Sequence, residues 1–401
     1  MGILRAVAST MGRISTFRSY QMVLLLAAAL AVVAFYYFGS ERQNFSSTTK
    51  RIKQTQASHN ANRNDADLSL DTRLERPGEG GGEEEREEDE EEDGSRRNDS
   101  GAHGDGRYHV LMMFTKVDKS RSLQEKFRVA MLSLVKHGRF LEGERLVLHF
   151  VTDKLSRELG ERMLPELLLD STFQYEAVFH DVEELTQKLF PIVEAMQKHF
   201  SAGSGAYYSD AIFFLSVAMH HIMPQELKRM VQLDLDLKYK TNIRGLFQEF
   251  GRFPPGAVIG IAREMQPVYR HTFWQYRKEH PGTRVGSPPP DGLPGFNSGV
   301  MLLDLEAMRS SALYNQLLQP GSVARLADQY RFRGHLGDQD FFTMIGMEHP
   351  GLFHPLSCGW NRQLCSWWRE HGYAEVFLLY SRCDRPVYIY HGNCNSPIPD
   401  D

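Results

Sequence analysis

The chain has 401 residues, of which 41% are hydrophobic and 24% are charged, enough for one large domain with additional segments. Its net charge of −5 is dominated by residues 83–93, where ten acids and one arginine give −9 and leave about +4 for the remainder. This balance excludes a strongly basic nucleic-acid-binding protein and assigns the acidic total to one segment.

The N-terminal 40 residues carry three arginines and no acid, and they include an apolar run from Met22 to Phe38. Seventeen residues is the short end of the roughly 17–25 that a membrane-spanning helix needs. A cleaved signal peptide is the alternative, but its apolar region is typically about 7–15 residues and ends in small residues, whereas this run ends in aromatics. We predict a cytosolic tail over residues 1–19, a transmembrane signal-anchor over 20–39 and a lumenal remainder.

Residues 40–106 are polar and charged, with three consecutive glycines before the acidic run. Because this composition cannot bury a core, we predict a disordered acidic stem between membrane and catalytic domain. Calcium or partner binding by the acids is the alternative. Two sequons on the lumenal side, at Asn44 and Asn98, predict N-glycosylation.

From Tyr108 onward, apolar runs typical of buried strands alternate with stretches of helical periodicity. This alternation predicts an α/β fold with a mainly parallel sheet flanked by helices, covering residues 107–401. Ligands of such sheets bind beyond the carboxyl ends of the strands. The expected strands include 108–115, 146–152, 175–179, 257–262, 299–303 and one that begins at Met230, and the expected helical stretches include 187–200 and 208–222.

Two carboxylates follow the strand that begins at Met230. Asp234 and Asp236 are separated by one residue, so an extended segment places both on one face and Leu235 on the other. Paired acids at a strand end suit Mg²⁺ or Mn²⁺, which usually carries phosphate. Asp-x-Asp also occurs by chance, so this interpretation depends on whether a second strand-like run, which delivers His391, reaches the same place.

Two later segments are candidates for the same edge of the sheet. The Pro- and Gly-rich stretch 282–295 is expected to form a long loop that faces substrate, and the small polar residues of 295–299 are expected beside a strand. Asp338 and Asp340 open a helix, whose positive N-terminal end suits their charge. We expect these two acids to cap the helix rather than to catalyse.

The cysteines are all in the last 44 residues, and an even number in a lumenal chain predicts two disulfides with three possible pairings. Their spacings fit no zinc pattern. They are Cys358, Cys365, Cys383 and Cys394.

Four short motifs follow one another along the chain: Asp-Leu-Asp at 234–236, Phe-Asn-Ser-Gly-Val-Met at 296–301, Gly-Asp-Gln-Asp at 337–340 and Tyr-His-Gly at 390–392. This ordered set resembles glycosyltransferase family 8, whose members are retaining enzymes of the GT-A fold. Within that family, the signal-anchor preceded by arginines and three further segments resemble the members that add xylose to xylosides in α-1,3 linkage. These segments are 188–194, 271–274 and 360–368.

The resemblance implies a single-pass type II protein of the endoplasmic reticulum membrane. It would use UDP-xylose to extend O-linked xylosyl-glucose on epidermal-growth-factor (EGF)-like repeats, Notch's among them. The oligomeric state stays open between monomer and homodimer.

The resemblance also implies roles for individual residues. Asp234, Asp236 and His391 would coordinate Mn²⁺, with Mg²⁺ as the alternative, because a cation neutralises the charge on a departing diphosphate and imidazole favours manganese. The residues expected at the sugar donor are Met112, Met113, Phe114, Thr115, Leu235, Asn297, Ser298 and Leu336. The residues expected at the acceptor are His271, Trp274, His335 and Trp368, with packing in the core as the alternative for the two tryptophans.

Two positions depart from the family pattern. Many members follow the terminal histidine with Gly-x-x-Lys-Pro-Trp, whose lysine holds the diphosphate, whereas here Gly-Asn-Cys-Asn follows His391. We expect Asn393 to take the place of that lysine. Most members also carry an arginine after a Tyr-Tyr pair, where this chain has Tyr207-Tyr-Ser-Asp210.

The family places a glutamine at the catalytic centre, and the match is Gln339. A covalent intermediate needs a carboxylate nucleophile, and an amide is too weak. We therefore expect the acceptor hydroxyl to attack on the face that the diphosphate leaves, with Gln339 stabilising the developing positive charge. The disulfides would hold the segment that carries His391, and we favour the pairs Cys358–Cys383 and Cys365–Cys394.

Two other functions compete with this one. The first is the same chemistry with UDP-glucose or UDP-galactose as sugar donor. The second is a non-catalytic lumenal lectin or adaptor of the same fold, which would have no need of the metal ligands.

Overall fold

The computed structural model describes residues 106–201 and 211–400. The predicted tail, signal-anchor and stem up to residue 105, both sequons and the Tyr207–Asp210 segment therefore lie outside the described residues. Within the two described ranges, no helix is long and apolar enough to cross a membrane.

A seven-stranded sheet forms the centre of the described part of the chain, in the order β3-β2-β1-β4-β7-β6-β8. Only β7 runs antiparallel to its neighbours, so the mainly parallel sheet predicted from the strand–helix alternation is confirmed. The strands are β1 (Arg107–Met113), β2 (Arg145–Thr152), β3 (Gln174–Asp181), β4 (Arg229–Leu233), β6 (Ile259–Arg263), β7 (Phe296–Asp304) and β8 (Phe353–Leu356).

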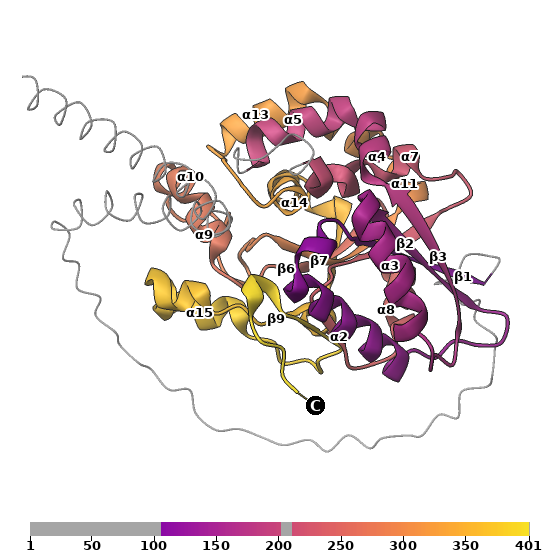
Figure 1. Cartoon of the computed structure of the whole chain (residues 1–401). Helices are drawn as coiled ribbons and strands as arrows, with labels where there is room; N and C mark the ends of the chain where they lie inside the picture. Colours follow the sequence, from indigo (N-terminus) through magenta and orange to yellow (C-terminus); the bar gives the residue numbers. More distant parts are fainter. Residues whose placement is uncertain (1–105, 202–210, 401) are drawn as a thin grey trace, which may run out of the picture. The chain divides into compact units, whose positions relative to one another are not determined.

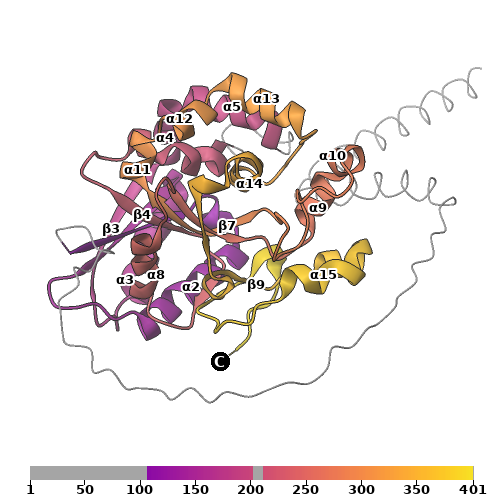
Figure 2. The ribbon, with the colours of Figure 1, turned by 180° about the vertical axis from the view of Figure 1, so that it is seen from behind.

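Helices cover both faces of this sheet (Figures 1 and 2). Successive strand residues point to opposite faces, so Val110 and Leu111 of β1 belong to two different hydrophobic clusters. One face carries α4 (Val182–Lys188), α5 (Phe190–Phe200), α7 (Met219–Ile222), α11 (Leu305–Ser310), α12 (Ala312–Leu317), α13 (Pro320–Gln329) and α14 (Asp338–Glu348). The other carries α2 (Arg121–His137), α3 (Lys154–Leu167) and α8 (Arg244–Phe247).

Three short helices lie to one side of the sheet in both views (Figures 1 and 2). They are α9 (Val268–Thr272), α10 (Trp274–Glu279) and α15 (Ala374–Ser381).

A small second sheet joins the two distant parts of the chain that carry the predicted metal ligands. It has the order β5-β10-β9, with β5 (Leu237–Tyr239), β10 (Ile389–His391) and β9 (Arg362–Gln363). The antiparallel pairing of β10 with β5 sets His391 opposite Leu237. Disulfides join Cys358 to Cys383 and Cys365 to Cys394, which is the pairing that the sequence analysis favours.

Three expected elements differ from the structure in detail. The helix expected over residues 187–200 is broken at Leu189 into α4 and α5, because Pro191 has no N–H with which to continue it. The stretch expected to be helical over 208–222 is described from residue 211 and is helical to its expected end, as the 3₁₀ helix Ile212–Ala218 followed by α7. Residues 296–298, expected beside a strand, form the beginning of β7 itself.

Candidate active site

Asp234 and Asp236 connect β4 to β5 at the carboxyl end of the central parallel strands. The Asp234 N–H donates to the Gly299 carbonyl of β7 at 3.0 Å, and the Gly392 N–H donates to the Asp236 carbonyl at 2.8 Å. These backbone bonds fix the turn from both sides. Leu235 between the acids is buried in the core, so both carboxylates face away from it, as the alternation predicted.

The structure brings the two acids and His391 together. The His391 Nε2 atom lies 3.4 Å from Asp234 Oδ2 and 3.3 Å from Asp236 Oδ1, and ligand atoms of all three residues lie within 4.8 Å of one another. A glycine at 299 is required here, because a Cβ at that position would lie 2.3 Å from the imidazole Cε1.

The second ring nitrogen of His391 is also held. Its Nδ1 lies 2.9 Å from the Oδ1 atom of the fully buried Asn361, so Nδ1–H donates to that oxygen and Nε2 is directed at the two carboxylates. Burial lowers the pKa of His391, but the hydrogen bonds and charges of Asp234 and Asp236 outweigh it and raise the pKa to about 9. Burial raises the pKa of Asp236, and His391 with Lys126 outweighs this and lowers it to about 2.

This donor set fits a divalent cation. Two carboxylates and one imidazole nitrogen oriented by a second hydrogen bond are ligands that Mn²⁺ accepts readily. The strong preference of the site for positive charge, visible in the raised pKa of His391, is what a bound cation would satisfy in place of the proton. Lys126 of α2 already supplies one cation, since its Nζ lies 3.2 Å from Asp236 Oδ2 and 2.8 Å from Asn395 Oδ1.

Gln339 lies in the first turn of α14 and is buried. Its Oε1 accepts the Ser298 N–H at 3.2 Å, and its Nε2 donates to Glu264 Oε2 and to the Tyr269 hydroxyl, each at 3.2 Å. The amide is therefore fixed on both sides, and its oxygen faces the strand that carries the expected sugar contacts.

Asp338, expected to cap α14, also contacts two serines. Its carboxylate accepts the Ser216 hydroxyl at 2.6 Å and the Ser298 hydroxyl at 3.0 Å, as well as the N–H of its neighbour Gln339. Burial raises the pKa of Asp338 to about 7, with a contribution from the charge of Asp234. Asp340 accepts the Leu336 N–H and the Tyr269 hydroxyl, and burial raises its pKa as well.

The residues expected at the sugar donor lie on several elements around this edge. Met112, Phe114 and Leu235 have buried side chains, so only their backbones are available to a ligand, whereas Met113 and Thr115 are half-buried. Asn297 and Ser298 begin β7, next to Gln339, and Leu336 is 38% exposed just before α14. The Asn393 Oδ1 accepts the N–H groups of residues 364 and 365, so this side-chain oxygen is held by the segment that follows β9.

The residues expected at the acceptor fall into two groups. His271 of α9 bonds the Tyr373 hydroxyl at 2.7 Å, and its ring lies 5.2 Å from the Trp368 ring, so the structure joins these two expected residues. Trp274 of α10 is 41% exposed. His335 is exposed beside Leu336, close to the start of α14.

Sequence reasoning missed three residues that the structure places at the site, namely Lys126, Glu264 and Asn361. Glu264 directly follows β6, which is the same pattern of an acid after an apolar strand that identified Asp234, so this signal was present. Lys126 lies within a helix and Asn361 in a 3₁₀ turn (Cys358–Asn361), and no local motif distinguishes either.

Comparisons with known proteins agree with this geometry. The sequence model of glycosyl transferase family 8 matches residues 128–372 of this chain. The chain is 59% identical to xyloside xylosyltransferase 1 of Homo sapiens and 60% identical to that of Mus musculus, each over the whole of both chains. The crystal structure of apo mouse xyloside xylosyltransferase 1 matches with a TM-score of 0.70 and 67% identity, over 73% of this chain and 99% of that chain. The chain belongs to glycosyl transferase family 8 and is a glycosyltransferase.

Proposed function

We propose that this chain is a xyloside α-1,3-xylosyltransferase that transfers xylose from UDP-xylose to O-linked xylosyl-glucose on EGF-like repeats. The transfer retains configuration and depends on Mn²⁺. The observation that carries this proposal is the convergence of Asp234, Asp236 and His391 beside Gln339 in a family 8 fold. The xylose donor and xyloside acceptor are supported by the names of the relatives that match over the full length.

A divalent cation bound by Asp234, Asp236 and His391 would neutralise the negative charge that grows on the departing diphosphate. Ser298 and Asn297 lie at the start of β7, where Ser298 contacts Gln339 of α14, and the sugar would lie beside them. Gln339 Oε1 is a carbonyl oxygen held by the Ser298 N–H, and it stabilises positive charge developing on the sugar. The acceptor hydroxyl attacks on the face that the diphosphate leaves, and its proton passes to the leaving phosphate.

The proposal includes a location in the endoplasmic reticulum membrane, with residues 20–39 as a type II anchor and glycans on Asn44 and Asn98. Two features support it. Arginines precede the apolar run, which favours a cytosolic N-terminus. All four cysteines pair, and disulfides form in oxidising compartments such as this lumen.

A screen of sugar donors tests the proposed activity. The purified chain would be incubated with Mn²⁺, a xylosyl-glucose acceptor and, in turn, UDP-xylose, UDP-glucose and UDP-galactose. We expect transfer of xylose alone, and we expect a chelator to stop it. Transfer of glucose or galactose instead would replace the proposed donor, and tight UDP binding without transfer from any donor would indicate a binding module.

A further inference from the structure

A single carboxylate links the metal ligands to the catalytic amide. Glu264 is 3% exposed and follows β6. Its Oε1 accepts the Gln266 N–H at 2.9 Å, while its Oε2 accepts the amide groups of Asn297 and Gln339, each at 3.2 Å. An ionised carboxylate only accepts hydrogen bonds, so it dictates that both amides turn their NH₂ groups toward it.

The first arm leads from Glu264 to His391 through two further side chains. Because Asn297 directs Nδ2 at Glu264, its Oδ1 faces away and accepts the Asn361 Nδ2 at 2.9 Å. Asn361 must then present Oδ1 to His391, whose Nδ1 lies 2.9 Å away. One hydrogen therefore sits on Nδ1, and Nε2 is left directed at Asp234 and Asp236, where a bound cation would replace the Nε2 proton.

The second arm leads from Glu264 to the catalytic amide. Gln339 donates one Nε2 hydrogen to Glu264 and the other to the Tyr269 hydroxyl, whose own hydrogen goes to Asp340 at 2.9 Å. With both Nε2 hydrogens engaged, the amide oxygen is left facing the Ser298 N–H and the expected sugar site.

We propose that Glu264 is a positioning residue that fixes, through these two arms, both the ring tautomer of His391 and the amide orientation of Gln339. The cation-binding arm of this inference rests on the proposed function. Two backbone N–H groups reinforce these hydrogen-bond directions, because an N–H group can only donate. The Gln266 N–H donates to Glu264 Oε1, and the Gly299 N–H donates to Asn297 Oδ1.

Glu264→Gln is the sharpest variant, because neither orientation of the new amide satisfies its surroundings. If its NH₂ replaces Oε2, it faces the NH₂ groups of Asn297 and Gln339. If its NH₂ replaces Oε1, it faces the Gln266 N–H. The variant changes the charge and hydrogen-bond polarity at an almost unchanged volume.

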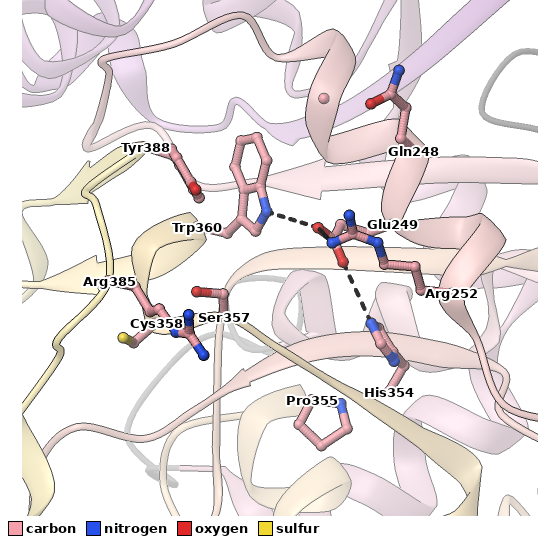
Figure 3. A pocket seen from close by; sticks show the side chains of 11 residues that line it. Gln248, Glu249, Arg252, His354, Pro355, Ser357, Cys358, Trp360, Arg385 and Tyr388 are labelled. Carbon is pink, nitrogen blue, oxygen red and sulfur yellow. Dashed lines mark hydrogen bonds and ion pairs between the residues drawn. The ribbon is translucent and has the colours of Figure 1, made fainter. Parts of the chain in front are cut away.

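The fold offers a matched control in Glu249, which is also buried but belongs to no part of this network. It lines a separate pocket of about 750 Å³, where its carboxylate accepts the Trp360 Nε1–H at 3.2 Å and lies close to His354 (Figure 3). Trp360 directly precedes Asn361, so Glu249→Gln changes a hydrogen bond of the same 3₁₀ turn while every hydrogen bond of the two arms keeps both of its partners.

The experiment measures Mn²⁺ affinity of the full chain by calorimetry at pH 8, above the pKa of about 7 to which burial raises Glu264. We expect Glu264→Gln to weaken Mn²⁺ binding by about 10–100-fold, because it would reorient Asn297 and Asn361, and Asn361 is the outer-shell partner of His391. Glu264→Asp should restore part of the affinity, and Glu249→Gln should bind as the wild type does. The ¹⁵N spectrum of the Mg²⁺-saturated protein should show hydrogen on Nδ1 of His391 in the wild type and lose this signature in Glu264→Gln.

The second arm is measured separately. At saturating Mn²⁺, Glu264→Gln should lower kcat about tenfold with little change in the KM for the sugar nucleotide, in line with the loss of one oriented group at the reaction centre. A loss of binding and rate that Glu249→Gln shares would indicate a general packing defect and overturn the inference.

Wild-type Mn²⁺ affinity and an unchanged His391 signature in folded Glu264→Gln would also overturn it. If Glu264→Gln does not fold, Asn361→Leu cuts the first arm with Glu264 in place, and the same affinity and spectral changes are expected. A wild-type chain that binds no Mn²⁺ would instead contradict the proposed function.

Discussion

Two regions of this molecule contain buried histidines whose pKa values are shifted in opposite directions. At the active site, His391 faces two carboxylates and an amide oxygen, and its pKa is raised to about 9. At the outer edge of the sheet, His149 of β2 lies between two other histidines, His109 of β1 and His180 of β3. Burial, followed by the charges of these histidines and of Arg107, lowers the pKa of His149 to about 3.

The difference shows that the partners decide what a buried imidazole does. Carboxylates accept hydrogen bonds and carry negative charge, so they stabilise a proton or a metal ion on His391. An imidazole neighbour must itself be neutral, with one nitrogen donating and the other accepting, to continue a chain of the kind seen at 2.9 Å spacing in His109, His149 and His180. The surroundings of His391 therefore favour positive charge, either a proton or a metal ion, whereas those of His149 favour the neutral imidazole.

The largest effect on the transfer rate is expected from removing one of the two carboxylates beside His391. Asp236→Asn removes a metal ligand and one negative charge beside His391, so transfer should fall by about 10³-fold or more, because the charge on the departing diphosphate is no longer neutralised. Circular dichroism should report an unchanged fold. Asp384→Asn, at an exposed aspartate whose carboxylate pairs with Arg382, serves as the control. A wild-type rate for Asp236→Asn in Mn²⁺ would contradict the assignment of the metal site.

A smaller effect on rate is expected from the catalytic amide. Gln339→Ala should leave binding of the sugar nucleotide intact and slow transfer by roughly 10–100-fold, a little under the loss of one oxyanion-type donor. Equilibrium binding and single-turnover rates measured on the same preparation separate the two quantities. Trapping a covalent sugar on any carboxylate of the protein would contradict the front-face mechanism.

The histidine chain at the outer edge should affect stability rather than rate. Because the pKa of His149 is lowered in the folded state, the unfolded chain binds more protons below pH 6.5. The stability contribution is therefore complete above about pH 6.5 and is lost progressively as the pH falls toward 3. At pH 5 the loss from this group is about 2 kcal/mol.

His149→Leu should consequently reduce the difference in free energy of unfolding between pH 7.5 and pH 5, as measured with urea. Its transfer rate at pH 7.5 should remain close to that of the wild type, because His109, His149 and His180 lie on β1, β2 and β3, whereas the metal ligands lie after β4 and on β10 and Gln339 lies on α14. An identical pH dependence in wild type and variant would show that His149 titrates normally in the folded protein.

The pattern of apolar and polar residues along the chain was sufficient to predict most strands of the central sheet. Strands β1, β2, β3 and β4 could be predicted because short, mainly apolar runs bounded by polar residues are typical of strands in an α/β domain. Asp234 and Asp236 could be predicted as a pair for the same reason, since an acid directly after such a run lies where the strand leaves the core. Helix boundaries were less certain, and Pro191 broke a helix that periodicity alone had joined.

What the sequence by itself determined is the set of elements and the two acids at the end of β4, because both follow from the spacing of apolar and charged residues along the chain. Only the tertiary structure decided which distant groups complete the site. The pairing of β10 with β5 brings His391 to the acids, and the polarity of the network around Glu264 depends on Asn297, Gln339 and Asn361. These groups are separated by tens of residues and meet only because buried polar atoms must find partners when the core closes.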